Sequence, residues 1–77
     1  VYKELKIVVP YSDIPTVSFT VSLAYELGGV RTDSRVIEAT KDPSLTEYTT
    51  IVSMPAGSTW YLYINNSQSP LQQGRVQ

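Results

Sequence analysis

The sequence predicts an all-β fold, a small antiparallel β-sandwich or barrel of five to six strands. Three observations lead to this prediction. Apolar residues alternate with small or hydroxylated ones in the most regular segment, short apolar segments are separated by Gly- and Pro-containing turns, and no segment is long and periodic enough for a crossover helix. A chain of 77 residues fits one domain at most, so residues 1–77 are expected to form a single β-sandwich-like unit.

The most regular segment, residues 16–25, has an apolar side chain at every odd position. Successive side chains of a strand point to opposite faces of the sheet, so this alternation predicts one buried and one solvated face. The predicted buried face carries Val17, Phe19, Val21, Leu23 and Tyr25, and the predicted solvated face carries Thr16, Ser18, Thr20, Ser22 and Ala24.

The remaining strands are predicted at residues 1–9, 30–40, 48–54, 59–65 and 71–77, the last interrupted by a glycine. The two glycines within 26–29 predict a hairpin turn, and residues 10–15, bounded by prolines, predict a connection. Residues 41–47 fit either one helical turn, with Asp42 as N-cap, or a simple turn, the interpretation that we favour. Weak alternation in 30–40, where Arg31, Asp33 and Arg35 share a face with Ile37, indicates an edge strand.

Residues 54–64, Met-Pro-Ala-Gly-Ser-Thr-Trp-Tyr-Leu-Tyr-Ile, combine the end of a strand, a Pro-Ala-Gly turn and an aromatic strand. This pattern resembles the segment found near the end of many secreted immunoglobulin-like and fibronectin-like β-sandwiches. The resemblance covers about a seventh of the chain and implies a fold class, with no functional residues carried over from it.

Composition argues against several functional classes. Six basic residues, none in a cluster, face seven acidic ones, so a nucleic-acid partner is not expected. No apolar run approaches the roughly 20 residues of a membrane-spanning helix. The chain has neither Cys nor His, which removes disulfides, zinc-type metal sites and the usual bases of nucleophilic catalysis. We therefore expect no cofactor, no metal and no enzymatic activity.

Tyr61 and Tyr63 are the first candidate binding residues. They should project from the face opposite Trp60. Leu62 and Ile64 share the face of Trp60, and because both are apolar, Trp60 is expected in the core. Two rings on one exposed face would form a platform for a sugar or for a protein interface. The alternative is that both tyrosines pack beneath a loop or against a second sheet.

Arg31 and Arg35 are the second candidate, because arginine offers forked donors to an anion. With Asp33 between them, a solvated row containing an internal ion pair explains them equally well. Asn65 begins an Asn-Asn-Ser acceptor pattern for N-glycosylation in a predicted loop, which has meaning only for a secreted eukaryotic protein.

The sequence therefore favours a non-catalytic structural or protein-interaction module, a building block of a cell-surface or virion assembly. The expected partners are other protein chains, in a self- or hetero-oligomer, because a domain this small has a limited core and strands available at its ends. The alternatives are a carbohydrate-binding module that uses the two tyrosines and a subunit of a small toxin or hydrolase. An extracellular, cell-surface or virion location is expected on the same grounds.

Overall fold

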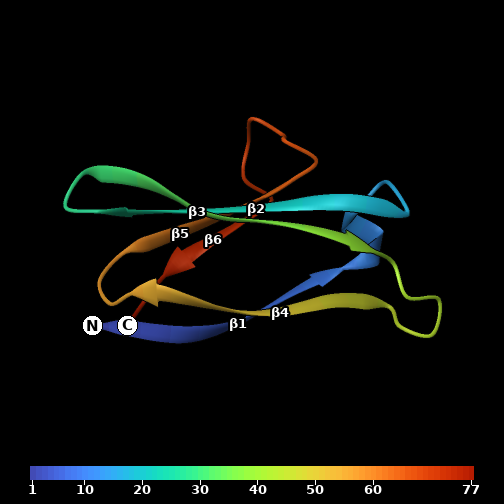
Figure 1. Ribbon diagram of the computed structural model, residues 1–77, viewed down its shortest axis with the longest axis horizontal. Helices are drawn as coiled ribbons and strands as arrows, with labels where there is room; N and C mark the ends of the chain where they lie inside the picture. The colour runs from blue at the N-terminus through green and yellow to red at the C-terminus, as the bar shows by residue number, and fades with distance from the viewer.

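The computed structural model describes residues 1–77 as two antiparallel sheets packed face to face, which confirms the all-β sandwich (Figure 1). The strands are β1 (Tyr2–Pro10), β2 (Ser18–Leu27), β3 (Val30–Thr40), β4 (Glu47–Pro55), β5 (Thr59–Ile64) and β6 (Gln72–Arg75). A short 3-10 helix, η1 (Tyr11–Asp13), lies in the connection between β1 and β2. All six strands fall within three residues of their predicted bounds.

One sheet pairs β1 with β4, and the other has the order β3-β2-β5-β6. In Figure 1 the four-stranded sheet lies above the two-stranded one, and both chain ends lie at the same end of the sandwich. In an immunoglobulin-like sandwich, strands B and E share one sheet and strands C, F and G share the other. Here β1 and β4 occupy the B and E places, and β2, β5 and β6 occupy the C, F and G places. The fold therefore has the strand order of such a sandwich without strands A and D.

The alternation of β2 organises the core, as predicted. Phe19, Val21 and Leu23 are buried against residues of both sheets. The Phe19 ring meets the Tyr48 ring of β4 edge to face, with centroids 5.4 Å apart and planes at 88°. Such a pair contributes about 0.5–1.5 kcal/mol beyond its buried area, and it joins the two sheets. The other core residues are Ile7, Val9, Ile14, Val52, Met54, Leu62, Ile64 and Val76.

Two residues of the β2 segment differ from the prediction in their burial. Val17 is 66% exposed, because β2 begins only at Ser18 and Val17 lies before the sandwich interior. Ala24 was placed on the solvated face, yet it is buried. It does lie on the outer face of the sheet, opposite Tyr61 of β5, and larger neighbouring side chains cover its single methyl group.

A β-bulge in β3 accounts for its weak sequence alternation. Leu23 pairs with Arg35 and Ala24 pairs with Asp33, so Ser34 has no partner on β2. Because of the bulge, Arg31 and Asp33 lie on the outer face of the sheet, while Arg35 and Ile37 lie on its inner face. The prediction that all three charged residues share a face with Ile37 was therefore wrong, whereas the prediction of an edge strand is confirmed.

The predicted turns are confirmed. Gly28 and Gly29 have φ angles of +60° and +78°, and a two-residue hairpin turn of type I′ requires positive φ at both positions. Residues 41–47 form a turn and no helix: the Ser44 N–H donates to Oδ1 of Asp42 at 2.9 Å, and the Leu45 N–H donates to the Asp42 carbonyl at 3.0 Å. The hydrogen bonds from the backbone and hydroxyl of Ser44 lower the pKa of Asp42.

The main-chain groups of β1 point alternately toward β4 and toward solvent. The Tyr11 N–H donates to the Thr46 carbonyl, and the Ala56 N–H donates to the Val1 carbonyl, so odd-numbered residues bond to β4. The N–H and C=O groups of the even-numbered residues, Lys6 among them, therefore face a free edge. Only the Val8 carbonyl finds a partner there, the side-chain amide of Gln72 at 2.9 Å.

This alternation is tested by proline at two lysines of the same strand. Lys6→Pro removes an N–H at the free edge and should lower the free energy of unfolding only slightly. Lys3→Pro removes an N–H that bonds to β4 and should cost about 1–3 kcal/mol. Urea unfolding of both variants checks the difference. Equal losses would show that the strand register is wrong.

Gly74 of β6 lies directly beneath the indole of Trp60, its register partner on β5. A Cβ atom at Gly74 would lie 2.8 Å from Nε1 of Trp60. This close approach explains why the predicted last strand contains a glycine. The indole fills the space over β6 and packs against the core, so the prediction that Trp60 faces the core is confirmed.

Gly74→Ala should therefore destabilise the fold. Removing a glycine from an unstrained position would stabilise it by about 0.4–1 kcal/mol through the unfolded state. Here the rigid indole must move, and overpacking of this kind costs about 1–3 kcal/mol. Thermal unfolding followed by Trp60 fluorescence measures the balance, with Gln73→Ala, on the opposite face of the same strand, as control. A stabilised Gly74→Ala variant would contradict this packing.

Candidate functional site

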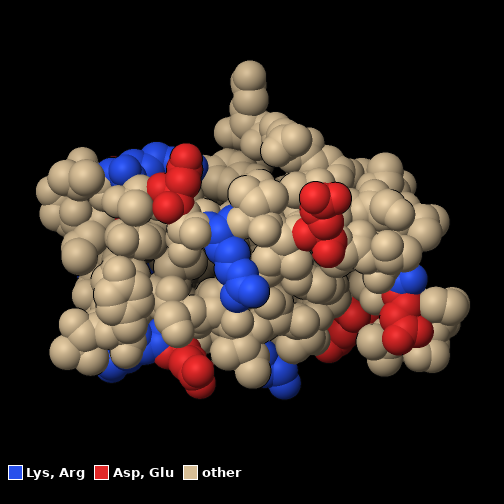
Figure 2. Space-filling model, in the orientation of Figure 1, with Lys and Arg blue, Asp and Glu red and all other residues tan.

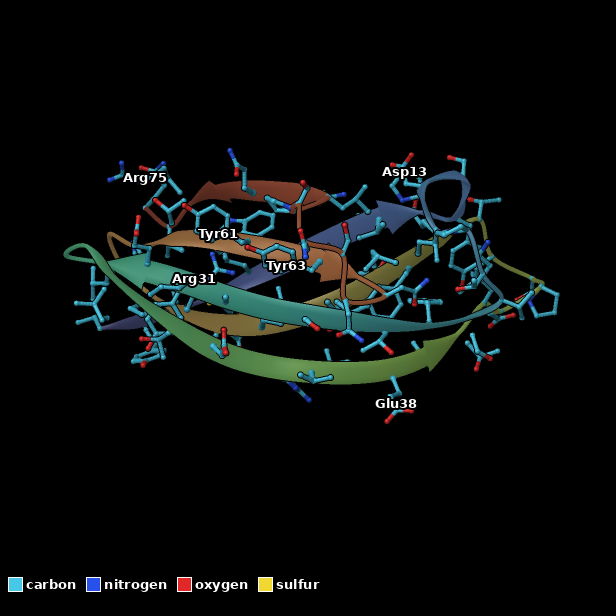
Figure 3. All side chains as sticks on the ribbon, turned by 90° about the horizontal axis from the view of Figure 1, so that it is seen from above. Asp13, Arg31, Glu38, Tyr61, Tyr63 and Arg75 are labelled. Atoms are coloured by element: carbon cyan, nitrogen blue, oxygen red, sulfur yellow. The ribbon has the colours of Figure 1, made fainter.

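Three of the four predicted site residues meet on the outer face of the four-stranded sheet. Tyr61 and Tyr63 come from β5 and pair with Ala24 and Ser22 of β2, on the face opposite Leu62. Arg31 comes from β3, on the other side of β2. Figure 3 looks onto this face and shows the arginine beside both tyrosines. We call these three residues the Arg31 cluster.

The guanidinium of Arg31 contacts both rings. Its Cζ atom lies 5.2 Å from the ring centroid of Tyr61 and 5.2 Å from that of Tyr63. Arg31 Nη2 also donates a hydrogen bond to the Tyr63 hydroxyl. This hydrogen bond, with smaller contributions from the charges of Tyr63 and Asp33, raises the pKa of Arg31. Arginine is cationic in proteins, and the attraction of its guanidinium to the two rings holds the side chain in position.

Small residues on β2 make this contact possible. Arg31 pairs with Glu26 of β2 and reaches diagonally across this strand to the two tyrosines, whose own partners on β2 are Ala24 and Ser22. A long side chain at either position would fill the space between the arginine and the rings. The small residues at alternate positions of β2, Ser22 and Ala24, therefore form the floor of the site.

The cluster borders an open groove of about 600 Å³, which we call the β3 groove. Its floor is β2, one side is β3, and the other side is Tyr63 with the loop after β5. This loop rises above the sheet at the top of Figure 1. The lining side chains include Ser22, Asp33, Ser34, Arg35, Val36, Asn66, Ser67 and Gln68. The volume lies within the range of small-ligand sites, about 300–1,000 Å³.

Charge on the molecule is dispersed. Figure 2 shows basic and acidic side chains interspersed over the face in view, and the protruding loop carries neither. On the outer face beside the β3 groove the ionised side chains are Arg31 and Asp33, whereas Arg35 belongs to the inner face of β3. One cation and one anion therefore lie beside the groove, in a protein of formal net charge −1.

The sequence interpretation of the tyrosines needs one correction. They do project opposite Trp60, but neither is a freely exposed platform, since both are half-buried and Arg31 contacts both rings. Arg35 is among the groove residues, but it pairs with the core residue Leu23 on the inner face and has no part in the cluster. Of the second candidate pair, Arg31 alone shares one surface with the tyrosines. No local pattern indicates this arrangement, because the order of the strands, with β2 between β3 and β5, is not visible in the sequence.

Asn65 has a structural role that the sequence did not suggest. Its Oδ1 accepts the Thr20 N–H at 3.1 Å, and its Nδ2 donates to Oγ1 of Thr16 at 3.0 Å. Asn65 and Asn66 have φ angles of +52° and +59°, and the Ser67 N–H donates to the Ile64 carbonyl, which closes a tight turn. The nitrogen that glycosylation would modify is thus already bonded, and Asn65 anchors the loop that borders the groove.

The chain was compared with protein-family models, with curated proteins and with solved structures, and none of the three comparisons gave a match. The structure has no group of three or more His, Cys, Asp or Glu side chains arranged to hold a metal ion. It also has no helix with the length and apolar character needed to cross a bilayer. The function must therefore be argued from the β3 groove and the Arg31 cluster.

Asn65→Ala should lower stability by about 1–2 kcal/mol, because it leaves the Thr20 N–H without its acceptor and places alanine at a positive φ. Asn66→Ala is the matched control, since it has a similar φ and no side-chain hydrogen bond in the structure. Chemical denaturation of both variants separates the two effects. An equal loss in both would mean that the Asn65 hydrogen bonds contribute nothing.

Proposed function

We propose that this chain is a non-catalytic protein-interaction module whose contact surface is the Arg31 cluster with the adjoining β3 groove. The observation that supports this most directly is the packing of Arg31 on Tyr61 and Tyr63. Tyrosine and arginine are the residue types most enriched at the energetic centres of protein interfaces. A guanidinium held in advance on two rings loses little conformational freedom when a partner binds.

The composition of the groove supports a binding role over a catalytic one. Its carboxylate is Asp33, and no histidine or cysteine exists in the chain to act as base or nucleophile. The groove is open to solvent and is bounded by a strand and a loop. A surface of this kind suits contact with another chain.

We further propose that the module is a building block of a larger assembly, of the kind found on cell surfaces and virions. The free edge of β1 supports this proposal, because the main-chain groups of Tyr2, Glu4 and Lys6 have no partner within the chain. Strand β3 is a second free edge. Unpaired edges are the usual sites at which β proteins join other chains.

Carbohydrate binding is the competing function, favoured by the hydroxyl and amide groups that line the groove beside Tyr63. It is less well supported, because Arg31 already contacts the two rings on which a sugar would stack. Titration with common polysaccharides, followed by tyrosine fluorescence, tests it. Trp60 faces the core and serves as an internal reference. Saturable binding that is lost in Tyr61→Ala, Tyr63→Ala would favour this alternative.

The assembly proposal is tested by the absolute mass in solution, measured by light scattering after size exclusion up to high micromolar concentration. The unaltered chain should form a discrete oligomer, and Tyr61→Ala, Tyr63→Ala should shift the equilibrium toward the monomer. Thr49→Ala, Ser53→Ala, on exposed positions of β4, is the matched control and should behave like the unaltered chain. A monomer at every concentration would contradict the proposal that the chain assembles with copies of itself.

A further inference from the structure

The donors of Arg31 are only partly used within the chain. A guanidinium has five N–H donors in a planar fork. One is bonded to the Tyr63 hydroxyl, and no acceptor in the chain pairs with the others. The two ring contacts hold the fork in place beside the β3 groove. The arrangement therefore offers a fixed cationic fork to a group from outside, and the planar group that matches it in geometry is a carboxylate.

From this we infer that the β3 groove binds an extended acidic segment of a partner protein, with an Asp or Glu carboxylate on Arg31 and an apolar side chain over Val36. The inference rests on the proposed interaction function and specifies the chemistry of its partner. Val36 is 69% exposed and lies beside the groove floor, opposite Ser22. Its exposed side chain gives the bound segment an apolar contact next to the cationic one.

The charges in the groove favour a carboxylate over a phosphate. Arg31 attracts any anion, but Asp33 lines the same groove and repels it, so the two together leave no excess positive charge. Attraction and repulsion both grow with the charge of the ligand and offset each other beside such a pair, so the second charge of a phosphate gains nothing there and adds a larger desolvation cost. A monoanionic side chain on a peptide therefore suits a site with one cation and one anion.

The neutral groups of the groove suit a peptide backbone. Hydroxyls of Ser22, Ser34 and Ser67 and amides of Asn66 and Gln68 line it from floor, strand and loop. These groups can donate to carbonyls and accept from N–H groups of an extended chain. Alternate side chains of such a chain point the same way about 7 Å apart. One acidic and one apolar residue two positions apart can therefore lie along the groove together.

The test is a titration of the full chain with two short peptides of equal length, one alternating glutamate and valine and one alternating glutamine and valine. Binding is followed by the NMR shifts of the Tyr61 and Tyr63 ring protons. The glutamate peptide should bind, and its affinity should fall with added salt. The glutamine peptide should bind at least tenfold more weakly, the size expected for loss of a charged hydrogen bond.

Three variants place the binding at Arg31. Arg31→Gln should weaken the glutamate peptide about tenfold or more, and Arg31→Lys, which keeps the charge and loses the fork, should weaken it by a smaller factor. Lys3→Gln removes the same charge from β1, away from the groove, and should leave binding unchanged. Melting temperatures of the variants show that each is folded. Equal losses in Arg31→Gln and Lys3→Gln would overturn the proposal.

Two further titrations identify the alternatives. If polygalacturonate binds in an Arg31-dependent way and the glutamate peptide does not bind, the groove is a site for an acidic glycan. If inorganic phosphate binds in an Arg31-dependent way and the peptide does not, the groove is a phosphate site. Either result overturns the peptide proposal. Failure of the peptide titration at a concentration where the chain is monomeric, while the mass measurement shows an oligomer at higher concentration, would refute this inference alone. Peptide binding by a chain that stays monomeric would refute self-assembly and leave the inference in place.

Discussion

The structure depends on the two unlike faces of β2. Its inner face carries Phe19, Val21 and Leu23, which form the centre of the core. Its outer face carries small side chains, Ser22 and Ala24, which let Arg31 of β3 reach across to β5. One alternating pattern thus supplies both the hydrophobic contact that holds the two sheets together and the open floor on which the Arg31 cluster forms. Stability and the candidate site are linked through a single strand.

The small core limits what this chain can do alone. Two strands face four, so the sandwich lacks partners along both edges of its smaller sheet. The chain partly compensates with side chains: Gln72 bonds the outward-facing Val8 carbonyl, and Trp60 covers Gly74 of the last strand. The Gln72 contact lies at the edge of β1, where a neighbouring strand lies in a larger sandwich of the same order. The features that support an interaction module are therefore also features of an incomplete sheet.

Much of the fold could be predicted from the sequence, because period-two alternation and glycine turns are local signals. The pair Gly28 and Gly29 fixed the hairpin, and the charges of β3 marked it as an edge. Features that depend on distant segments were not predictable. Nothing local distinguishes Val17, outside the sandwich, from Val21 within it, and Ser34 carries no sign of a bulge. The tyrosines and Arg31 were identified as separate candidates, because only the strand order brings them together.

The bulge at Ser34 reconciles two demands on β3. The glycine turn fixes the hairpin end, which places Arg31 on the outer face, while the core requires Ile37 on the inner face, and these positions have the same parity. An odd number of extra residues between them is the only way to meet both demands. Loss of Ser34 would regularise the ladder and leave every cross-strand partner where it is. The length of β3 can therefore change at Ser34 without moving inward-facing side chains to the outer face. The hairpin end of β3, which bears Arg31, and the end that contributes Ile37 to the core can thus change independently of each other.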